Sequence, residues 1–321
     1  MKVINNLLFC LILFVSCKKD KVISIPKPFS APDSFHIVNA CNTSELYVVE
    51  TSFGNDNFAI QSNIVNFRTS NDDGNTWTTK SSPEGGGFCS YVRSKDTFYL
   101  YNNKIFYTED GGDHFEVLDS SMVTHDLVFL SKNVGIKTGI NIYRTTDGGH
   151  NWEKTYTANG FLGAKQIQFP SPTVGYSNVC FQADLSVYGS IIKTVDGGIT
   201  WQEILPNIGE FINDISFVST KTGYFTTTYG DLYKTTDGGN TWTLVSNYNA
   251  VNVGYNQIEF VTETQGYLWN SGSYTKVYLT KDSGNTWTLV ADTGCDNVQN
   301  VQRVGNSVFI TGRYGSILKS N

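Results

Sequence analysis

An eight-residue pattern recurs six times along the chain, and this repeat limits the possible folds more than any other feature. Each copy has an aspartate at its third position, a glycine at its fifth and an aromatic residue at its eighth. The copies occupy residues 70–77, 108–115, 145–152, 194–201, 235–242 and 280–287. Their spacing of about 40 residues is the size of one four-stranded blade of a β-propeller.

The residues between the copies predict four strands in each repeat. In the fifth repeat we expect strands over 213–218, 223–227, 232–235 and 242–245, with the repeated pattern forming the turn between the third and the fourth. Tight glycine turns, such as the one at Gly230, separate the others. No segment of useful length has the period of a helix, so we expect an all-β fold.

The repeated pattern has the chemistry of a tight turn. An aspartate that begins a turn accepts hydrogen bonds from the backbone N–H groups that follow it, and glycine adopts the positive φ angles that such turns need. The aromatic residue then returns beneath the turn and buries its ring between strands. We therefore assign structural roles to Asp72, Asp110, Asp147, Asp196, Asp237 and Asp282, and to Trp77, Phe115, Trp152, Trp201, Trp242 and Trp287.

A seventh blade is visible in part at the end of the sequence. Residues 301–305 and 307–311 fit its first two strands, and 315–321 aligns with the third strand of the fifth repeat. Because no fourth strand follows, we expect 22–25 to supply it. The expected fold is a seven-bladed β-propeller of four-stranded antiparallel blades, closed by an N-terminal strand and forming one domain over 22–321.

The repeated pattern resembles the Asp-box, also called the bacterial neuraminidase repeat. This motif occurs in sialidases, sortilin-type receptors, xyloglucan-degrading propeller enzymes and photosystem II assembly factors. The run YKTTDGGNTW at 233–242 is most similar to the assembly-factor branch. The resemblance implies the propeller fold but no particular function. The assembly factors have a richer arginine patch than this chain, which has five arginines, so their photosystem-binding role is not carried over.

The first 17 residues have the features of an export signal and take no part in the fold. Lys2 precedes the apolar run 7–15, which is too short to span a bilayer, and Ser16 and Cys17 resemble the lipobox of bacterial lipoproteins. This resemblance implies that Cys17 carries the lipid and that 18–21 is a short tether. We therefore expect a lipid-anchored protein of the bacterial cell envelope, at the outer membrane. The alternative is an ordinary cleaved signal with an incidental cysteine.

Four further cysteines are widely spaced and form no CxxC pair, so we expect no metal site. They are Cys41, Cys89, Cys180 and Cys295. An exported compartment permits disulfides, but the sequence leaves the pairing open, and buried thiols are an equal alternative. The net charge of -6 does not indicate a nucleic-acid partner, and no motif calls for a cofactor.

The catalytic groups of a sialidase are not recognisable in the sequence. That chemistry needs an arginine triad beside a Tyr–Glu pair, yet Arg68 and Arg144 lie at repeat positions just before a copy of the pattern. The arginines left are Arg93, Arg303 and Arg313. The alternative function is a glycoside hydrolase or lyase that uses carboxylates about 5–10 Å apart. Its candidate residues are Asp184, Glu210 and Glu259.

The face opposite the repeated turns is the expected binding surface. It carries the connections between blades and the turns between second and third strands, and aromatic residues cluster around these loops. Aromatic side chains on such a face are typical of protein or glycan binding. The candidate binding residues are Trp269, Tyr188, Tyr274, Phe161, Phe211 and Tyr255, with Arg93 and Arg303 as a small basic spot near the channel.

Trp269 is the only tryptophan outside a copy of the pattern, and the adaptable Gly- and Ser-rich segment 270–274 follows it. A rigid aromatic beside a flexible polar loop is common in recognition surfaces. The competing interpretation is that Trp269 fills the core. We expect a monomeric, non-enzymatic scaffold that binds a protein or an envelope glycan.

Overall fold

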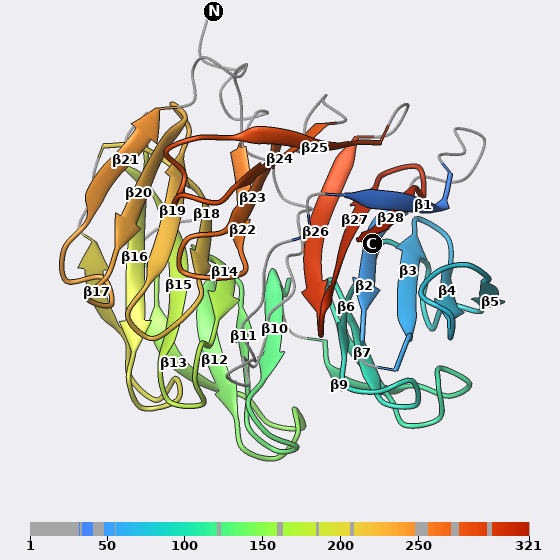
Figure 1. Ribbon diagram of the computed structural model, residues 1–321. Coiled ribbons are helices and arrows are strands. Elements are labelled where there is room, and N and C mark those ends of the chain that lie inside the picture. Colours follow the sequence, from blue (N-terminus) through green and yellow to red (C-terminus); the bar gives the residue numbers. More distant parts are fainter. Residues whose placement is uncertain are drawn as a thin grey trace, which may run out of the picture.

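The computed structural model describes Pro32 and residues 34–40, 48–54, 56–120, 123–158, 163–183, 186–205, 209–247, 256–270, 276–293 and 297–320. These residues form twenty-eight β-strands in seven four-stranded antiparallel sheets (Figure 1). Within the same ranges, no helix has the length and apolar character needed to cross a membrane. The predicted all-β, seven-bladed propeller is confirmed.

Six blades are made of four consecutive strands each. Blade 1 contains β2 (Val48–Phe53), β3 (Ala59–Asn63), β4 (Phe67–Ser70) and β5 (Thr78–Lys80). Blade 2 contains β6 (Cys89–Val92), β7 (Phe98–Tyr101), β8 (Ile105–Thr108) and β9 (Glu116–Asp119). Blade 3 contains β10 (Asp126–Phe129), β11 (Gly135–Thr138), β12 (Asn141–Thr145) and β13 (Glu153–Thr157).

The next three blades follow the same order. Blade 4 contains β14 (Gly163–Gln168), β15 (Gly175–Ala183), β16 (Ser186–Thr194) and β17 (Gln202–Leu205). Blade 5 contains β18 (Ile212–Phe217), β19 (Gly223–Thr227), β20 (Asp231–Thr235) and β21 (Thr243–Asn247). Blade 6 contains β22 (Asn256–Phe260), β23 (Gly266–Asn270), β24 (Lys276–Thr280) and β25 (Thr288–Asp292).

Blade 7 joins the two ends of the described chain. Its strands are β26 (Val298–Val304), β27 (Ser307–Gly312), β28 (Ile317–Ser320) and, on the outside, β1 (Phe35–Asn39). β1 pairs with β28 in antiparallel register, with Phe35 opposite Ser320 and Asn39 opposite Ile317. An N-terminal strand therefore closes the ring, as predicted.

The closing strand is not the segment that the sequence suggested, so the assignment of 22–25 is wrong. That segment lies outside the described residues. The lengths of the connections between blades explain this correction. The connection from β1, which ends at Asn39, to β2, which begins at Val48, is as long as the connection from β5, which ends at Lys80, to β6, which begins at Cys89. A strand over 22–25 would need a much longer connection to β2 than other blades use.

The first strands of neighbouring blades lie side by side around the axis. Buried carboxylates link them, because each accepts a hydrogen bond from a backbone N–H of a neighbouring first strand. Glu50 Oε2 accepts from Ser90 N at 2.7 Å, and Asp126 Oδ2 accepts from Ile167 N at 3.0 Å. Buried polar groups need such partners, so these carboxylates have a structural role.

Each copy of the repeated pattern, hereafter a box turn, is built around a buried hydroxyl as well as an aspartate. In blade 5, Thr235 Oγ1 accepts from Gly239 N at 2.9 Å and donates to Asp237 Oδ1 at 2.8 Å. Asp237 also accepts from Thr241 N at 2.9 Å and from Thr241 Oγ1 at 2.6 Å. All six box turns contain the Ser/Thr-to-glycine bond, at 2.8 to 3.0 Å. The role of this hydroxyl was not predicted from the sequence.

The box turns also press one blade against the blade before it. Gly239 has a φ of +91°, and a Cβ at this position would lie 2.2 Å from Ile204 Cδ1 of blade 4. Trp242 packs beneath the turn, with its ring 4.8 Å from Phe225 and 6.0 Å from Phe217, in edge-to-face geometry. The Trp242 side chain is half-buried and packs against a core cluster shared by blades 4 and 5.

The two cysteines in the described ranges differ in state. Cys89, at the start of β6, is disulfide-bonded. Cys180, in β15, is a buried thiol. Cys41 and Cys295 lie outside the described residues. The chain therefore contains both states that the sequence left open.

Candidate functional site

The propeller has two different ends. The box turns lie together with the turns that join first and second strands, because Gly148 N donates to Asn133 O at 2.9 Å and Gly238 N donates to Lys221 O at 2.7 Å. We call this end the box face. Since strands run alternately, the turns between second and third strands and the connections between blades lie at the opposite end, the loop face.

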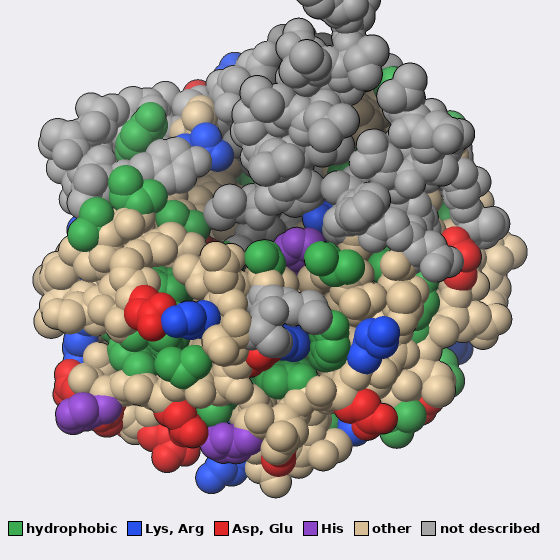
Figure 2. Space-filling model, turned by 180° about the vertical axis from the view of Figure 1, so that it is seen from behind, with side chains coloured by type: hydrophobic (Ala, Val, Ile, Leu, Met, Phe, Trp, Pro, Cys, Tyr) green, Lys and Arg blue, Asp and Glu red, His purple; other side chains and the backbone are tan. Residues whose placement is uncertain are grey.

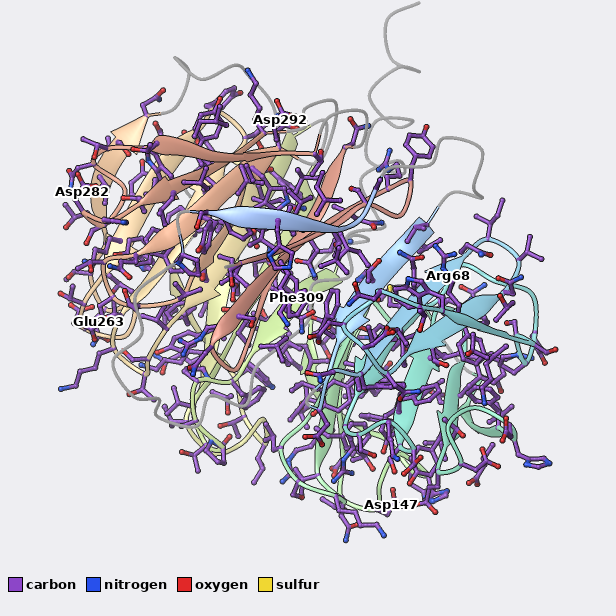
Figure 3. The ribbon with its side chains drawn as sticks, turned by 45° about the vertical axis from the view of Figure 1, so that its right-hand side comes forward. Arg68, Asp147, Glu263, Asp282, Asp292 and Phe309 are labelled. Atoms are coloured by element: carbon purple, nitrogen blue, oxygen red, sulfur yellow. The ribbon has the colours of Figure 1, made fainter. Side chains whose placement is uncertain are left out.

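The box aspartates are hydrogen-bond acceptors and stay ionised. The Thr241 side chain and backbone hold the pKa of Asp237 at about 2, with a further contribution from Thr235. Asp147 and Asp282 lie at the periphery in Figure 3, and Figure 2 shows acidic side chains and histidines along its lower edge. Among the described residues, no group of His, Cys, Asp or Glu could hold a metal ion. Carboxylates with lowered pKa values cannot serve as general acids at neutral pH.

Arg68 and Arg144 take part in packing, as their repeat positions suggested. Arg144 Nε donates to Gly197 O of blade 4 at 3.0 Å. Arg68 Nε donates to Gln61 Oε1 at 2.6 Å, and its guanidinium carbon lies 5.2 Å from the centre of the Trp77 ring. These contacts support the view that neither residue belongs to a substrate-binding triad.

Trp269 belongs to the core, so its proposed role as an exposed binding residue is wrong. Its side chain is 1 % exposed. It lies on β23 opposite Gln257 and Val277, within a cluster that includes Val298 and Val301 of blade 7. The competing interpretation, that this tryptophan fills the space between blades 6 and 7, accounts for the geometry.

Arg93 and Arg303 lie on the box face, which corrects their assignment to the binding surface opposite. Arg93 follows β6, and its Nη1 donates to Lys132 O of blade 3 at 3.3 Å. Arg303 is near the end of β26, where Nη1 donates to Val261 O of blade 6 at 3.2 Å. Burial lowers the pKa of Arg303, and the charge of Glu259 acts in the opposite direction. Both arginines tie neighbouring blades together.

The remaining aromatic candidates are only partly covered by the structure. Phe211 is half-buried in the connection between blades 4 and 5. Tyr188 lies on β16, opposite Phe181, but its side chain is not described. Phe161, Tyr255 and Tyr274 lie outside the described residues. Phe211 is therefore the one aromatic candidate whose side chain the structure places on the loop face.

The candidate catalytic carboxylates do not form a pair. Glu210 precedes β18 and lies at the loop-face end of blade 5, whereas Glu259 is the penultimate residue of β22 and lies toward the box face of blade 6. A strand of five or six residues spans about 17–20 Å. The distance between these two carboxyl groups is therefore larger than the 5–10 Å needed for a glycosidase pair. Asp184 lies outside the described residues.

The loop face carries exposed apolar side chains that sequence reasoning missed because they are single residues in turns. Val123 precedes blade 3 and is 51 % exposed, and Ile140, in a turn of blade 3, is also 51 % exposed. The two segments touch, since a Cβ on Gly139 would lie 2.6 Å from Val123 O. Among the described residues, the exposed large apolar side chains on this face are Ile64, Val65, Val123, Ile140 and Tyr229. Val123 and Ile140 come from touching segments, and exposed apolar groups that lie together can mark an interaction surface.

One protein-family model matches part of the sequence. Residues 189–315 match the family described as "Sortilin-Vps10: Sortilin, neurotensin receptor 3". This range covers the end of blade 4 through most of blade 7. No curated protein matches the sequence.

Solved structures match a larger part of the chain than the family model does. The structure "YCF48 bound to D1 peptide" is 17% identical with a TM-score of 0.71, covering 92% of this chain and 99% of that chain. YCF48 from Cyanidioschyzon merolae is also 17% identical, with a TM-score of 0.67 and coverage of 90% and 99%. The GH74 xyloglucanase from Xanthomonas campestris is 15% identical, with a TM-score of 0.67, covering 90% of this chain and 53% of that chain. At such identities the matches show the fold, and the chain is a seven-bladed β-propeller that resembles the sortilin-type and assembly-factor propellers.

Proposed function

We propose that this chain is a lipid-anchored propeller of the bacterial cell envelope that binds a protein partner through its loop face and catalyses no reaction. The observation that carries the proposal is the set of exposed apolar side chains on that face. Aliphatic groups such as Val123 and Ile140 favour a protein partner over a glycan, because sugars stack on aromatic rings. The YCF48 structure with its bound peptide gives a precedent for peptide binding by this fold.

Two observations support export and anchoring. The disulfide at Cys89 is typical of oxidising compartments outside the cytoplasm. The direction of β1 puts Phe35 at the box face, because this residue pairs with Ser320 at the box-face end of β28. Tyr267 Oη donates to Pro32 O at 2.8 Å and holds the chain there. A lipid on Cys17 would therefore leave the loop face free to meet a partner.

The first described contact sets an upper limit on the distance between the lipid and the propeller. With 18–21 as the tether, the propeller would lie within about 14 Å of the lipid, at ~3.5 Å for each residue. The first described contact is at Pro32, so the chain between Cys17 and that residue reaches at most about 50 Å. The anchor therefore permits a partner some distance from the bilayer.

The lipid anchor is tested by substitution of one atom. Cys17→Ser should abolish labelling of the full chain by a palmitate analogue and release the protein from membranes. Cys180→Ser is the matched control, because Cys180 lies inside blade 4. Labelling that persists in Cys17→Ser would contradict the proposed anchor.

The binding face is tested by photocrosslinking in cells that express the full chain. A photoreactive amino acid at Val123 or Ile140 should give a discrete crosslink to a protein. Positions Val195 and Ile199 are the controls, because they are 65 % and 54 % exposed and lie in a box turn. Crosslinks from the control positions alone would assign binding to the box face and contradict the proposal.

A further inference from the structure

The box turn of blade 4 differs from the other box turns in the residues that it exposes. It carries Val195 and Ile199 at the second and sixth positions of the repeated pattern, and these side chains are 65 % and 54 % exposed. The other five copies have polar or charged residues at both positions, which are Asn71 and Asn75, Glu109 and Asp113, Thr146 and His150, Thr236 and Asn240, and Lys281 and Asn285. Exposed aliphatic side chains at these positions are therefore specific to blade 4.

The neighbouring turn of blade 4 lacks charge in the same way. Pro172 and Thr173 lie between β14 and β15, and both residues are exposed. Thr173 O accepts a hydrogen bond from Gly197 N of the box turn at 2.9 Å, and the turn between first and second strands makes the equivalent contact in other blades. In blades 1, 2, 3, 5 and 6 at least one of the two equivalent positions is charged, and these charged residues are Asp56, Lys95, Asp96, Lys132, Lys221 and Glu263.

The two turns of blade 4 are held against each other. A Cβ on Gly197 would lie 3.2 Å from Pro172 O. Asp196 lies between Val195 and Ile199, and its Oδ1 accepts from Ile199 N at 3.0 Å, so this carboxylate is used within the turn. The result is a rigid, mostly apolar projection on the box face. We call Pro172, Val195 and Ile199 the blade-4 tip.

Exposed lysines flank the blade-4 tip on both sides. Lys132 lies in the corresponding turn of blade 3 and Lys221 in that of blade 5, and both side chains are exposed. Aliphatic side chains with cations beside them suit the surface of a bilayer, where apolar groups enter the head-group region and lysines meet lipid phosphates. Charge and apolar character therefore both fit a phospholipid surface.

The chain also enters the propeller at the box face. Phe35 lies there, and Tyr267 Oη donates to Pro32 O at 2.8 Å. Because the chain between Cys17 and Pro32 can reach about 50 Å, the tether alone does not fix the orientation of the propeller on the membrane. A second contact on the same face would fix it.

We propose that the blade-4 tip inserts into the head-group region of the bilayer that holds the lipid anchor, and thereby turns the loop face away from the membrane. The inference rests on the proposed function and adds a second membrane contact to its anchor. Lipid-anchored proteins commonly combine an acyl chain with a second signal of this kind. Lys132 and Lys221 would extend along the inserted tip and place their ammonium groups among the phosphates.

The test uses the full chain reconstituted in vesicles of phosphatidylethanolamine and phosphatidylglycerol. An environment-sensitive fluorescent amino acid at Thr173 reports on the tip without replacing any of its three residues. Lipids that carry a spin label on the head group should quench this probe about threefold more than the same probe at Ile140 on the loop face. Lys132→Gln with Lys221→Gln should weaken the quenching, and more so in vesicles rich in phosphatidylglycerol.

A matched pair of variants isolates the aliphatic side chains. Val195→Thr with Ile199→Asn gives the blade-4 box the sequence of the blade-5 box, TTDGGNTW, so the variant should fold, and it should lose most of the quenching at Thr173. Leu244→Thr with Leu289→Thr is the control and should leave the quenching unchanged. These two leucines are 52 % and 48 % exposed on the outer strands β21 and β25.

The outcomes separate this inference from the proposed function. Equal quenching at Thr173 and Ile140, or quenching that survives Val195→Thr with Ile199→Asn, would overturn the membrane contact. A photoreactive residue at Ile199 should crosslink lipid, and a discrete protein crosslink from it would assign the tip to a protein and also overturn the inference. If Cys17→Ser releases the protein from membranes but Thr173 is not quenched in the unaltered chain, the lipid anchor stands and only the second contact falls.

Discussion

Replacing Thr235 by valine should remove one hydroxyl from a box turn without changing the volume of the side chain. Thr235 is 1 % exposed, and its Oγ1 accepts from Gly239 N and donates to Asp237 Oδ1. The substitution leaves the buried Gly239 N–H without an acceptor. A buried donor in this state costs about 1–3 kcal/mol, so we expect Thr235→Val to destabilise the propeller by roughly that amount.

Denaturant unfolding measured by tryptophan fluorescence gives the change in stability, and hydrogen exchange reports on the turn itself. The Gly239 amide should exchange faster in Thr235→Val, while amides of blades 1 to 3 should be unchanged. Thr235→Ser retains the hydroxyl and should recover most of the loss. Thr241→Val is a second control, because Thr241 is exposed and bonds only to Asp237 through its hydroxyl.

Two results would refute this reasoning. If Thr235→Val unfolds at the wild-type denaturant concentration, the hydroxyl does not contribute as the geometry implies. If Thr235→Ser is as unstable as Thr235→Val, the loss comes from packing of the threonine methyl group and not from the hydrogen bonds.

Three further predictions follow from the fold. The pKa of Asp237 is about 2 in the folded chain and about 4 in the unfolded chain. Its hydrogen bonds therefore stabilise the fold above pH 4, and this stabilisation is lost as the pH falls from 4 toward 2. Between pH 4 and pH 2, the denaturation midpoint of the wild type should fall more steeply than that of Asp237→Asn. Trp269→Ala should destabilise the chain by about 3–5 kcal/mol, and acrylamide should quench Trp269 poorly; little loss of stability would contradict its core position. Deleting 35–39 should expose the edge of β28, lower the melting temperature and give dimers on size-exclusion chromatography, whereas deletion of 22–25 should leave melting unchanged.

The repeat predicted the fold because its information is local. The box turns, the four strands of each blade and the role of Trp242 all depend on residues within one repeat, and six copies confirm one another. The ring closure was predicted in kind but placed at the wrong residues, because 22–25 also precedes blade 1 and is followed by Pro26 and Pro28, which suit an outer edge strand. The length of the other blade connections would have indicated 35–39 instead.

The candidate site was less predictable because it depends on contacts between repeats. Trp269 stood out in sequence only by lying outside a box, and that distinction did not reveal the valines of blade 7 that bury it. The buried ion pair between Lys137 of blade 3 and Asp119 of blade 2 gave no signal either, although Lys137 lies 5.0 Å from the centre of the Trp152 ring. Side-chain partners in different blades share no local pattern that one sequence could reveal.

The pairing of β1 with β28 also determines the order in which the molecule can be completed. Blades 1 to 6 need only neighbouring segments of chain, so each can form soon after its residues are available. Blade 7 instead needs partners far apart, because it pairs Phe35 with Ser320, and its Gln302 bonds to Phe53 of blade 1, 249 residues away. Long-range pairing of this kind is slow because the entropy of loop closure is lost before the contacts form. We expect the docking of β1 onto β28 to be the last step of folding, and until then β28 has an unpaired edge.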